Sequence, residues 1–263
     1  MRQHTRIPQV IALLLAAGAQ AAQPDPAIRN FIACPIVRDT ASVPCWLAEY
    51  QGELYFLTLQ TDVSAPVNPP WLGHRVLVEG KRSDKPRICG GIPLEPVHLS
   101  VVAEPDPSCN VILPAEERYN LTFEPPRPPG PSGGRLAFNT LNVPAQPDAP
   151  KSGTQRYTVT YDFNGMVGFK HPSQLMPALQ TARALPARRV EIVGYRGAAL
   201  LSDGTVLQEQ AGLAQRRAEQ VAELLRGAGL VAPTYSTKWV EAAPTPDGVD
   251  DYRSRRVEIT LLP

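Results

Sequence analysis

Apolar and polar positions alternate regularly in the last part of the chain, from residue 156 onward. Every second residue from Tyr157 to Phe163 is apolar or aromatic, which predicts a strand with one buried face. Val190–Tyr195, Tyr235–Val240 and Arg256–Leu262 are rich in β-branched and aromatic residues, and they predict three further strands.

Two helices are expected between these strands. Pro172 suits the first turn of a helix, and Pro186 ends the apolar positions that recur at helical spacing after it, namely Leu175, Met176, Leu179 and Ala182. Gln208–Leu225 carries the clearest helical stripe of the chain, and Gly227 and Gly229 follow it. The resulting order β-α-β-α-β-β predicts an α+β domain over residues 156–263, with its helices on one face of a mixed sheet.

The part of the chain from about Asn30 to Phe123 has no helical period and consists of short β-rich runs. The runs are Trp46–Tyr50, Leu54–Leu59, Arg75–Gly80, Ile88–Ile92 and Val97–Ala103, and a Gln51-Gly52 turn joins the first two as a hairpin. They predict a small β-barrel or sandwich over residues 30–124. The stretches GHRVLVEGKR and ICGGIPLEPVHLSV resemble the strands of an OB-fold barrel.

Proline separates these two parts. Eight of the 26 residues from 125 to 150 are proline, and glycines interrupt them. Proline removes backbone donors and glycine raises the entropy cost of order, so a packed core is not expected here. We expect a semi-extended linker over residues 125–155, in which Arg135–Val143 could still pair as one strand.

The N-terminus has the pattern of an export signal. Arg2, His4 and Arg6 precede an apolar run from Ile7 to Ala17, and Ala19-Gln20-Ala21 fits the small-x-small pattern of a signal peptidase site. The run is shorter than the about 20 residues that span a bilayer. We interpret residues 1–21 as a signal peptide, and the alternative is an uncleaved amphipathic or core helix. No cysteine comes directly after the cleavage site, so a lipid anchor is not expected there.

Charge and hydropathy limit the partners. Without residues 1–21 the chain has 24 basic and 25 acidic residues, a net charge of −1. It has no basic excess to hold a polyanion, so nucleic acid is not an expected partner. No other long apolar segment occurs, which predicts a mature chain without a transmembrane segment. The expected location is the periplasm, either free or in association with the outer membrane or cell wall.

The four cysteines, Cys34, Cys45, Cys89 and Cys109, all lie in the first half of the chain. An even number in an oxidising compartment predicts disulfides, here two. Three connectivities are possible, and we expect Cys34–Cys45 and Cys89–Cys109 because each closes a local loop. A zinc site is the alternative, but the chain has no CxxC pair or histidine cluster to support it.

Three stretches of residues 156–263 carry a resemblance to a known family. VEIVGYRG (Val190–Gly197), LAQRRAEQVAELLRGAGL (Leu213–Leu230) and SRRVEITL (Ser254–Leu261) resemble the second strand, the signature helix and the closing strand of the OmpA-like domain. The resemblance implies a domain that holds the cell wall without a covalent bond. In that family an aspartate after the second strand and an arginine on the signature helix grip the diaminopimelate of the peptide stem. One acid and one bidentate arginine suit a ligand with an ammonium and a carboxylate on one carbon.

The resemblance assigns the ligand-binding arginine to Arg217, but it finds no acid in the turn Tyr195-Arg196-Gly197, where the aspartate is expected. Asp203, in the longer loop that follows, is the candidate substitute, and Gln210 stands where the family often has asparagine. The candidate ligand-binding residues are therefore Arg217, Asp203, Gln210, Tyr195 and Gly197, with Asp250 and Asp251 as further acids.

Each candidate also has an ordinary structural interpretation. Arg217 can be a salt-bridged helix arginine, and Ser202-Asp203-Gly204 is a common turn sequence. Arg255 and Arg256 are expected to pair with nearby carboxylates. Arg196 puts positive charge where the family has negative charge, so it would repel the ammonium of the ligand.

No catalytic arrangement is found in the sequence. His74, His98 and His171 have no partner at metal spacing and no adjacent nucleophile, and G-x-S-x-G and H-E-x-x-H are absent. We therefore expect neither enzyme activity nor a cofactor.

Three hypotheses remain for the function. In the first, the C-terminal domain binds peptidoglycan and the N-terminal domain contacts another envelope component. In the second, the C-terminal domain has lost the wall ligand and serves as a protein–protein interaction module of an envelope complex. The third places an enzyme that acts on wall or glycan in the N-terminal domain.

Overall fold

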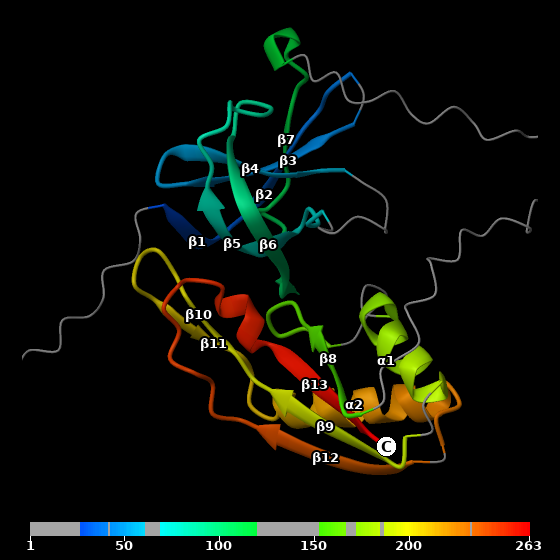
Figure 1. Ribbon diagram of the computed structural model, residues 1–263. Coiled ribbons are helices and arrows are strands. Elements are labelled where there is room, and N and C mark those ends of the chain that lie inside the picture. Colours follow the sequence, from blue (N-terminus) through cyan, green and yellow to red (C-terminus); the bar gives the residue numbers. More distant parts are fainter. Residues whose placement is uncertain are drawn as a thin grey trace, which may run out of the picture.

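The structure is a computed structural model that describes residues 27–41, 43–60, 69–119, 153–166, 172–184, 187–231 and 233–263. A seven-stranded sheet and a four-stranded sheet lie one above the other, with a β-hairpin and a short 3-10 helix between them (Figure 1). The predicted signal peptide, most of the predicted linker and His171 lie outside the described residues.

The N-terminal half forms the seven-stranded sheet, in the order β1-β5-β6-β4-β3-β2-β7. Its strands are β1 (Ile28–Ala33), β2 (Pro35–Arg38), β3 (Cys45–Tyr50), β4 (Glu53–Leu59), β5 (His74–Arg82), β6 (Ile92–Pro105) and β7 (Val111–Leu113), and η1 (Glu117–Tyr119) follows. The predicted hairpin is confirmed: β3 and β4 pair antiparallel, and Gln51 and Gly52 at the turn both have positive φ. Phe31 stacks on Tyr50 in the core of this sheet, with ring centroids 4.6 Å apart.

Two predictions for this half are corrected. The predicted barrel does not close: among the described strands, β1 pairs only with β5 at one end of the strand order, and β7 occupies the outer side of β2 at the other end. No ladder joins β1 to β7 in the described part of the chain, and the sheet stays open. The predicted strand Ile88–Ile92 is mostly a tight turn. Cys89 and Gly90 both adopt positive φ, and Ile88 makes one isolated bridge to Gly91.

The two expected disulfides are present, but their predicted pairing is wrong. Cys34 is bonded to Cys109 and Cys45 to Cys89, with Cα–Cα distances of 4.8 and 6.5 Å. The strand register explains the difference, because the antiparallel pairing of β2 with β3 puts Arg38 opposite Cys45 and leaves Cys34 at the far end. The parallel pairing of β2 with β7 sets Ile36 beside Val111, which brings the preceding cysteines together. All four cysteines are bonded in pairs, so none is a free thiol that could bind zinc in this structure.

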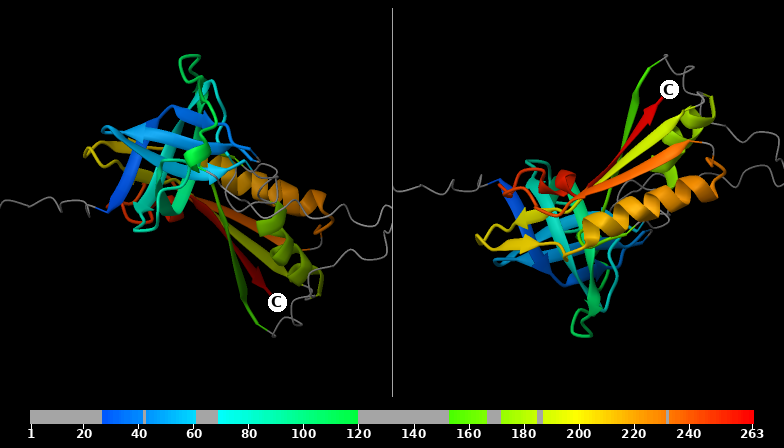
Figure 2. Two further views of the ribbon diagram at one scale, coloured as in Figure 1. Left: turned by 90° about the horizontal axis from the view of Figure 1, so that it is seen from above. Right: turned by 90° about the horizontal axis from the view of Figure 1, so that it is seen from below.

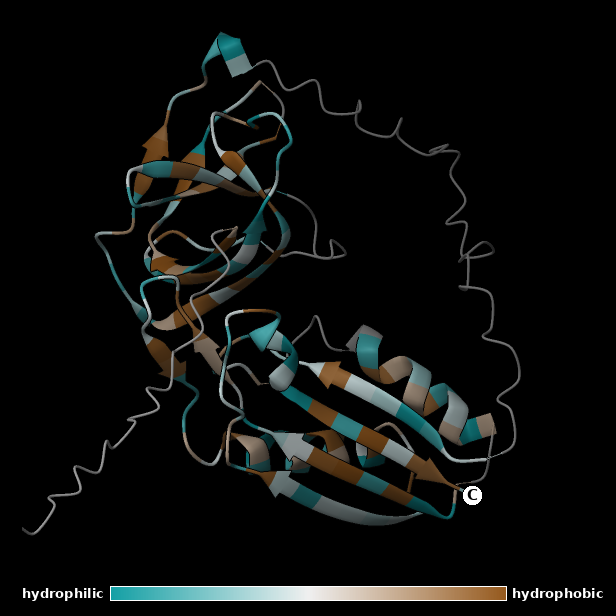
Figure 3. Ribbon diagram, turned by 60° about the vertical axis from the view of Figure 1, so that its left-hand side comes forward, coloured by the Kyte–Doolittle hydropathy of each residue, from teal (hydrophilic) through white to brown (hydrophobic). Residues whose placement is uncertain are grey.

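The C-terminal half forms the four-stranded mixed sheet, in the order β12-β9-β13-β8, with both α-helices on one face (Figure 2). Its elements are β8 (Gln155–Thr160), α1 (Pro172–Ala184), β9 (Arg189–Tyr195), β10 (Ala198–Leu200), β11 (Val206–Gln208), α2 (Leu213–Gly227), β12 (Thr234–Val240), η3 (Asp251–Ser254) and β13 (Arg256–Leu262). Bands of alternating hydropathy run along its strands (Figure 3), and the apolar positions face the helices. Val190, Ile192, Val257 and Ile259 are fully buried there.

Three boundaries in this half differ from the predicted ones. α2 begins at Leu213 and not at Gln208, because Gly212 has a φ of 76°, outside the helical region. Its predicted start is occupied by the β10–β11 hairpin, which lies between β9 and α2. β8 ends at Thr160, so the predicted strand is three residues too long. Neither α-helix, at 13 and 15 residues, is long and apolar enough to cross a bilayer.

The two sheets are joined by polar contacts from the C-terminal loops to β1 and β6. The side-chain amide of Asn30 donates to the carbonyls of Leu200 and Gly248, at 3.0 and 2.9 Å, and its oxygen accepts from a β5 backbone N–H. Ser100 Oγ on β6 accepts from the backbone N–H of Phe163 at 2.8 Å. Since Asn30 is only 2% exposed, its hydrogen bonds fix one half against the other.

An ion pair lies at the centre of this interface. The Arg255 guanidinium binds both carboxylate oxygens of Glu79 on β5, with 3.0 Å between Nη1 and Oε1, and the two side chains are 1% and 5% exposed. Beside the ion pair, Leu77 of β5 packs against Ala199 and Leu201 of the hairpin region. A bidentate contact that excludes water has a narrow allowed geometry, so it sets the relative orientation of the two halves.

Removal of one partner of this pair should weaken the whole molecule. Glu79→Ala leaves a buried, unpaired guanidinium, which costs about 3–5 kcal/mol of unfolding free energy. In differential scanning calorimetry, we expect the wild type to unfold in one thermal transition. In the variant, we expect the transition temperature to fall and the transition to separate into two. The control is Lys85→Ala, which breaks the exposed ion pair with Glu95 and should cost about 0–1 kcal/mol. A single, unshifted transition in Glu79→Ala would contradict the interface described above.

Candidate functional site

Arg217 of α2 lies inside the molecule, where the end of the four-stranded sheet meets the seven-stranded sheet. Its side chain has 0% exposure. Nε donates to the Gly165 carbonyl at 3.0 Å, Nη1 donates to the Tyr195 carbonyl at 3.1 Å, and Nη2 reaches the Asp162 carbonyl at 3.4 Å. The two remaining N–H groups point at one carboxylate, so all five donors of the guanidinium are used within the chain.

That carboxylate belongs to Glu209, which comes directly after β11. Glu209 Oε1 and Oε2 lie 2.6 and 2.8 Å from Nη2 and Nη1 of Arg217, in a bidentate ion pair. Each oxygen also accepts one backbone N–H, from Asn164 and from Gly197, both at 2.8 Å. Four donors around a side chain that is 2% exposed satisfy the buried charge. Arg217 also lies over the Tyr161 ring at 4.5 Å, and burial raises the pKa of that phenol.

Gly197 lies in the turn where the resemblance expects an aspartate, and the structure has no room for a side chain at this position. A Cβ at this position would lie 2.4 Å from Cγ of Arg255 and 2.5 Å from Oγ of Ser254. Arg255 is held in that place by Glu79 of the other sheet. The interface between the two halves therefore takes the space of the missing acid.

The remaining predicted residues do not converge on Arg217. Asp203 is exposed at the tip of the β10–β11 hairpin, where it accepts the backbone N–H of Thr205 at 2.9 Å, and this hydrogen bond lowers the pKa of the carboxyl group. Gln210 is exposed and its backbone N–H donates to Asn164. The Tyr195 hydroxyl donates to Glu258 at 3.1 Å, and only the carbonyl of this residue reaches Arg217. Arg196 pairs with Glu241 at 3.9 Å.

Asp251 and Asp250 serve the loop that precedes β13. Asp251 accepts the backbone N–H groups of Leu200 and Gly248, at 2.8 and 3.0 Å, and burial raises the pKa of its carboxyl group. Asp250 pairs with Arg253 at 3.1 Å. These contacts connect the loop to the hairpin and keep both acids out of the Arg217 site.

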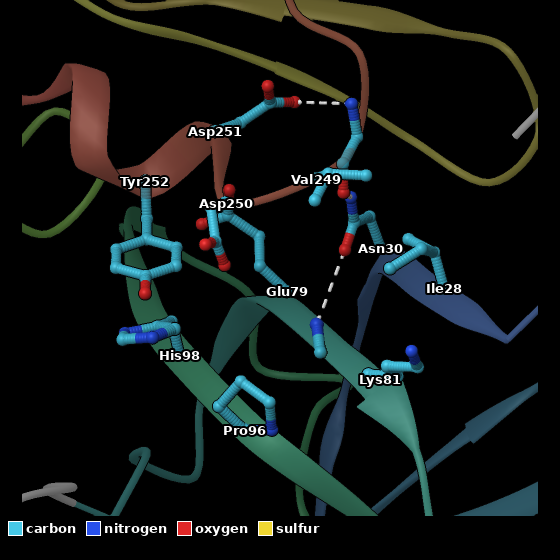
Figure 4. Close-up of a pocket in the computed structure, with 12 residues that line it drawn as sticks. Ile28, Asn30, Glu79, Lys81, Pro96, His98, Val249, Asp250, Asp251 and Tyr252 are labelled. Carbon is cyan, nitrogen blue, oxygen red and sulfur yellow. Dashed lines mark hydrogen bonds between the residues drawn. The ribbon is translucent and has the colours of Figure 1, made fainter. Parts of the chain in front are cut away.

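A cavity of about 130 Å³ opens between the two halves, beside the interface ion pair (Figure 4). Asn30, Lys81 and His98 line it from the seven-stranded sheet, and Asp250, Asp251 and Tyr252 line it from the η3 loop. The His98 and Tyr252 rings stack across it, with centroids 3.4 Å apart. Because its walls come from both halves, the cavity depends on their docked arrangement.

Glu209 and Glu79 are the two residues of this site that sequence reasoning missed. Glu79 had a detectable signal, because it is a charge at the end of the apolar run Val76–Val78 on β5, a position where burial requires a partner. Glu209 had no such signal, because it lies within Gln208–Leu225, where the sequence predicts a helix. The hairpin places it eight residues before Arg217 and directly opposite the guanidinium.

No protein-family model and no curated protein matches the chain. Two solved structures are similar to part of it. One is the OmpA-like domain of FopA1 from Francisella tularensis, with 15% identity over 41% of this chain and 71% of that one, at a TM-score of 0.31. The other is the cell wall anchor of the T6SS from Pseudomonas aeruginosa, with 20% identity over 43% and 83%, at a TM-score of 0.33. At these values the likeness says nothing about a ligand of the present chain.

A side chain at position 197 should destabilise the fold. Gly197→Ala places a methyl group against Arg255, and we expect a loss of about 1–3 kcal/mol in unfolding free energy from urea denaturation. Gly227→Ala is the matched control, because a Cβ there meets no atom within 4 Å and φ is not positive. Equal stability of the two variants would show that position 197 has space for an acid.

Acidification should weaken the docked structure through His98. Burial, followed by the charge of Arg255, lowers the pKa of His98 below 6.5, while Asp250 and Asp162 act in the opposite direction. The folded state therefore favours the neutral ring, and its stability falls as pH drops through the unfolded value of about 6.5. We expect melting temperatures measured from about pH 8 to about pH 5.5 to fall more steeply for the wild type than for His98→Gln. Parallel curves would contradict this assignment.

Proposed function

We propose that the protein is a non-enzymatic component of the cell envelope, in which the OmpA-like domain acts as a protein–protein interaction module and does not hold diaminopimelate. The observation that carries this proposal is the closed ion pair of Arg217 and Glu209. The guanidinium has no exposed surface and no N–H group left for a ligand.

The energetic cost of ligand entry supports the proposal. A ligand carboxylate can reach Arg217 only if Glu209 leaves, and Glu209 would then lose both contacts to the guanidinium. Removal of one partner from a buried pair costs about 3–5 kcal/mol, which weakens binding by roughly 150- to 5,000-fold. A ligand of micromolar intrinsic affinity would therefore bind in the millimolar range.

The other half of the ligand site is also missing. An ammonium group needs a carboxylate, but position 197 is a glycine covered by Arg255, and Arg196 adds a second positive charge to the same turn. Asp203, the candidate substitute, is engaged in its own turn. Neither charge of diaminopimelate thus has a free partner among these residues.

The disulfides support a location outside the cytoplasm. Both connect parts of the chain that are distant in sequence, with separations of 75 and 44 residues, and such bonds persist in oxidising compartments. Together with the signal pattern of residues 1–21, they favour an exported chain. Free periplasmic and wall-associated forms are both compatible with this location.

Wall binding is the second candidate function, and one observation favours it. Arg217 stands at the position of the ligand-binding arginine of the family, and the structure has a carboxylate seated on it in bidentate geometry. If Glu209 exchanged places with a ligand, the same pocket would accept that carboxylate.

Sedimentation with purified peptidoglycan sacculi that contain diaminopimelate separates the two functions. We expect the protein without residues 1–21 to stay in the supernatant, while a wall-binding OmpA-like domain used as positive control sediments. Retention that is lost in Arg217→Ala but kept in Arg216→Ala, a change at the exposed neighbouring arginine, would establish wall binding and overturn the proposal. Circular dichroism of each variant checks that the fold is intact.

A further inference from the structure

The strand β12 has one free side. It pairs in parallel with β9 over seven residues, from Thr234 to Val240, and no described element pairs with its other side. Figure 1 shows β12 at the outer edge of the four-stranded sheet, away from the seven-stranded sheet. The opposite edge of the sheet, β8, is partly covered, because the backbone N–H of Thr160 donates to the Gln174 side chain of α1.

The hydrogen bonds at the two ends of β12 show which of its residues point outward. Thr234 donates its N–H to Arg188, and the Val240 carbonyl accepts from Arg196, so the even-numbered residues direct their backbone groups at β9. Backbone direction alternates along a strand, so the N–H and C=O groups of Tyr235, Thr237 and Trp239 point away from the sheet. They form a row of groups that can bind another strand.

Apart from the charge of Lys238, this edge lacks the features that usually prevent strand pairing. Between Thr234 and Val240 the strand has no proline and no bulge, and Lys238 is its only charge. Trp239 and Val240 are 44% and 41% exposed. Exposure of these two apolar side chains to water does not stabilise the isolated chain. The edge is therefore suited to pairing with another strand.

The sequence of the strand is complementary to itself when two copies run antiparallel about Thr237. The outward-pointing residues then form three hydrogen-bonded pairs, Tyr235 with Trp239 twice and Thr237 with its own copy. Tyr–Trp and Thr–Thr cross-strand pairs both stabilise sheets. Lys238 faces Ser236 of the other copy, so the two like charges do not meet. A shift centred on Tyr235 or Trp239 leaves one end of each strand unpaired.

We propose that β12 is a homodimer interface, in which the four-stranded sheets of two copies join across a two-fold axis at Thr237. The occupant of the edge is a second copy of this chain. A strand-to-strand contact of this length is smaller than a standard stable interface, so the dissociation constant is on the order of tens of micromolar. The proposal is independent of whether Arg217 binds the wall, because the two sites use different elements.

Sedimentation equilibrium of the protein without residues 1–21, from about 1 to about 300 µM, tests the dimer. Thr237→Pro removes an outward-pointing N–H and no hydrogen bond to β9, so the monomer should stay folded and dimerisation should weaken by about tenfold or more. Val231→Ser, at a position that is 73% exposed and outside the strand, is the matched control and should leave the dissociation constant unchanged. A monomer at all concentrations, or a dimer that Thr237→Pro does not affect, overturns the proposal.

A pair of charge variants tests the register. Ser236→Glu brings a carboxylate opposite Lys238 of the other copy and should tighten the dimer by roughly two- to tenfold, while Ser236→Lys should weaken it by a similar factor. Within one chain, position 236 lies beside Glu191 of β9, so each variant also changes the folding stability. That contact is present in monomer and dimer alike, so it does not decide the dissociation constant. Equal dissociation constants for the two variants would rule out the antiparallel register.

Discussion

The ion pair of Arg255 and Glu79 is the contact on which the arrangement of the molecule depends. Its two charges come from different sheets and are both withdrawn from water, so each needs the other in place. Arg255 is also the first residue before β13, the strand between β9 and β8 in the four-stranded sheet. The position of the seven-stranded sheet therefore directly constrains the central strands of the four-stranded sheet.

The same arginine also shapes the turn after β9 in the C-terminal half. Its side chain lies across Gly197 and excludes an acid from the turn after β9. The backbone N–H of Gly197 in that turn donates to Glu209, whose carboxylate also neutralises Arg217. The absence of room for a side chain at position 197 and the closed ion pair of Arg217 thus both lie where the N-terminal half docks onto this end of the sheet.

The sequence predicts a helix or strand well where one pattern of apolar and polar residues continues along the whole element. The elements that were predicted correctly are of this kind. The strands β9, β12 and β13 and the hairpin β3–β4 follow from alternation and turn residues. The hairpin β10–β11 escaped prediction because its strands have three residues each, too few to establish a period. Glu209 was missed with it. The disulfide pairing depends on β2 lying beside β7, a contact between residues about 75 positions apart, which no local pattern encodes.

The order of the cysteines along the chain has a consequence for biogenesis. The bridge from Cys34 to Cys109 encloses the bridge from Cys45 to Cys89, so Cys34 is not bonded to Cys45, the next cysteine along the chain. An oxidant that met the thiols one after another during secretion would couple Cys34 with Cys45 first, and thiol–disulfide exchange would then have to undo that bond. On the proposed export route, the native pairing therefore requires late oxidation or a disulfide isomerase.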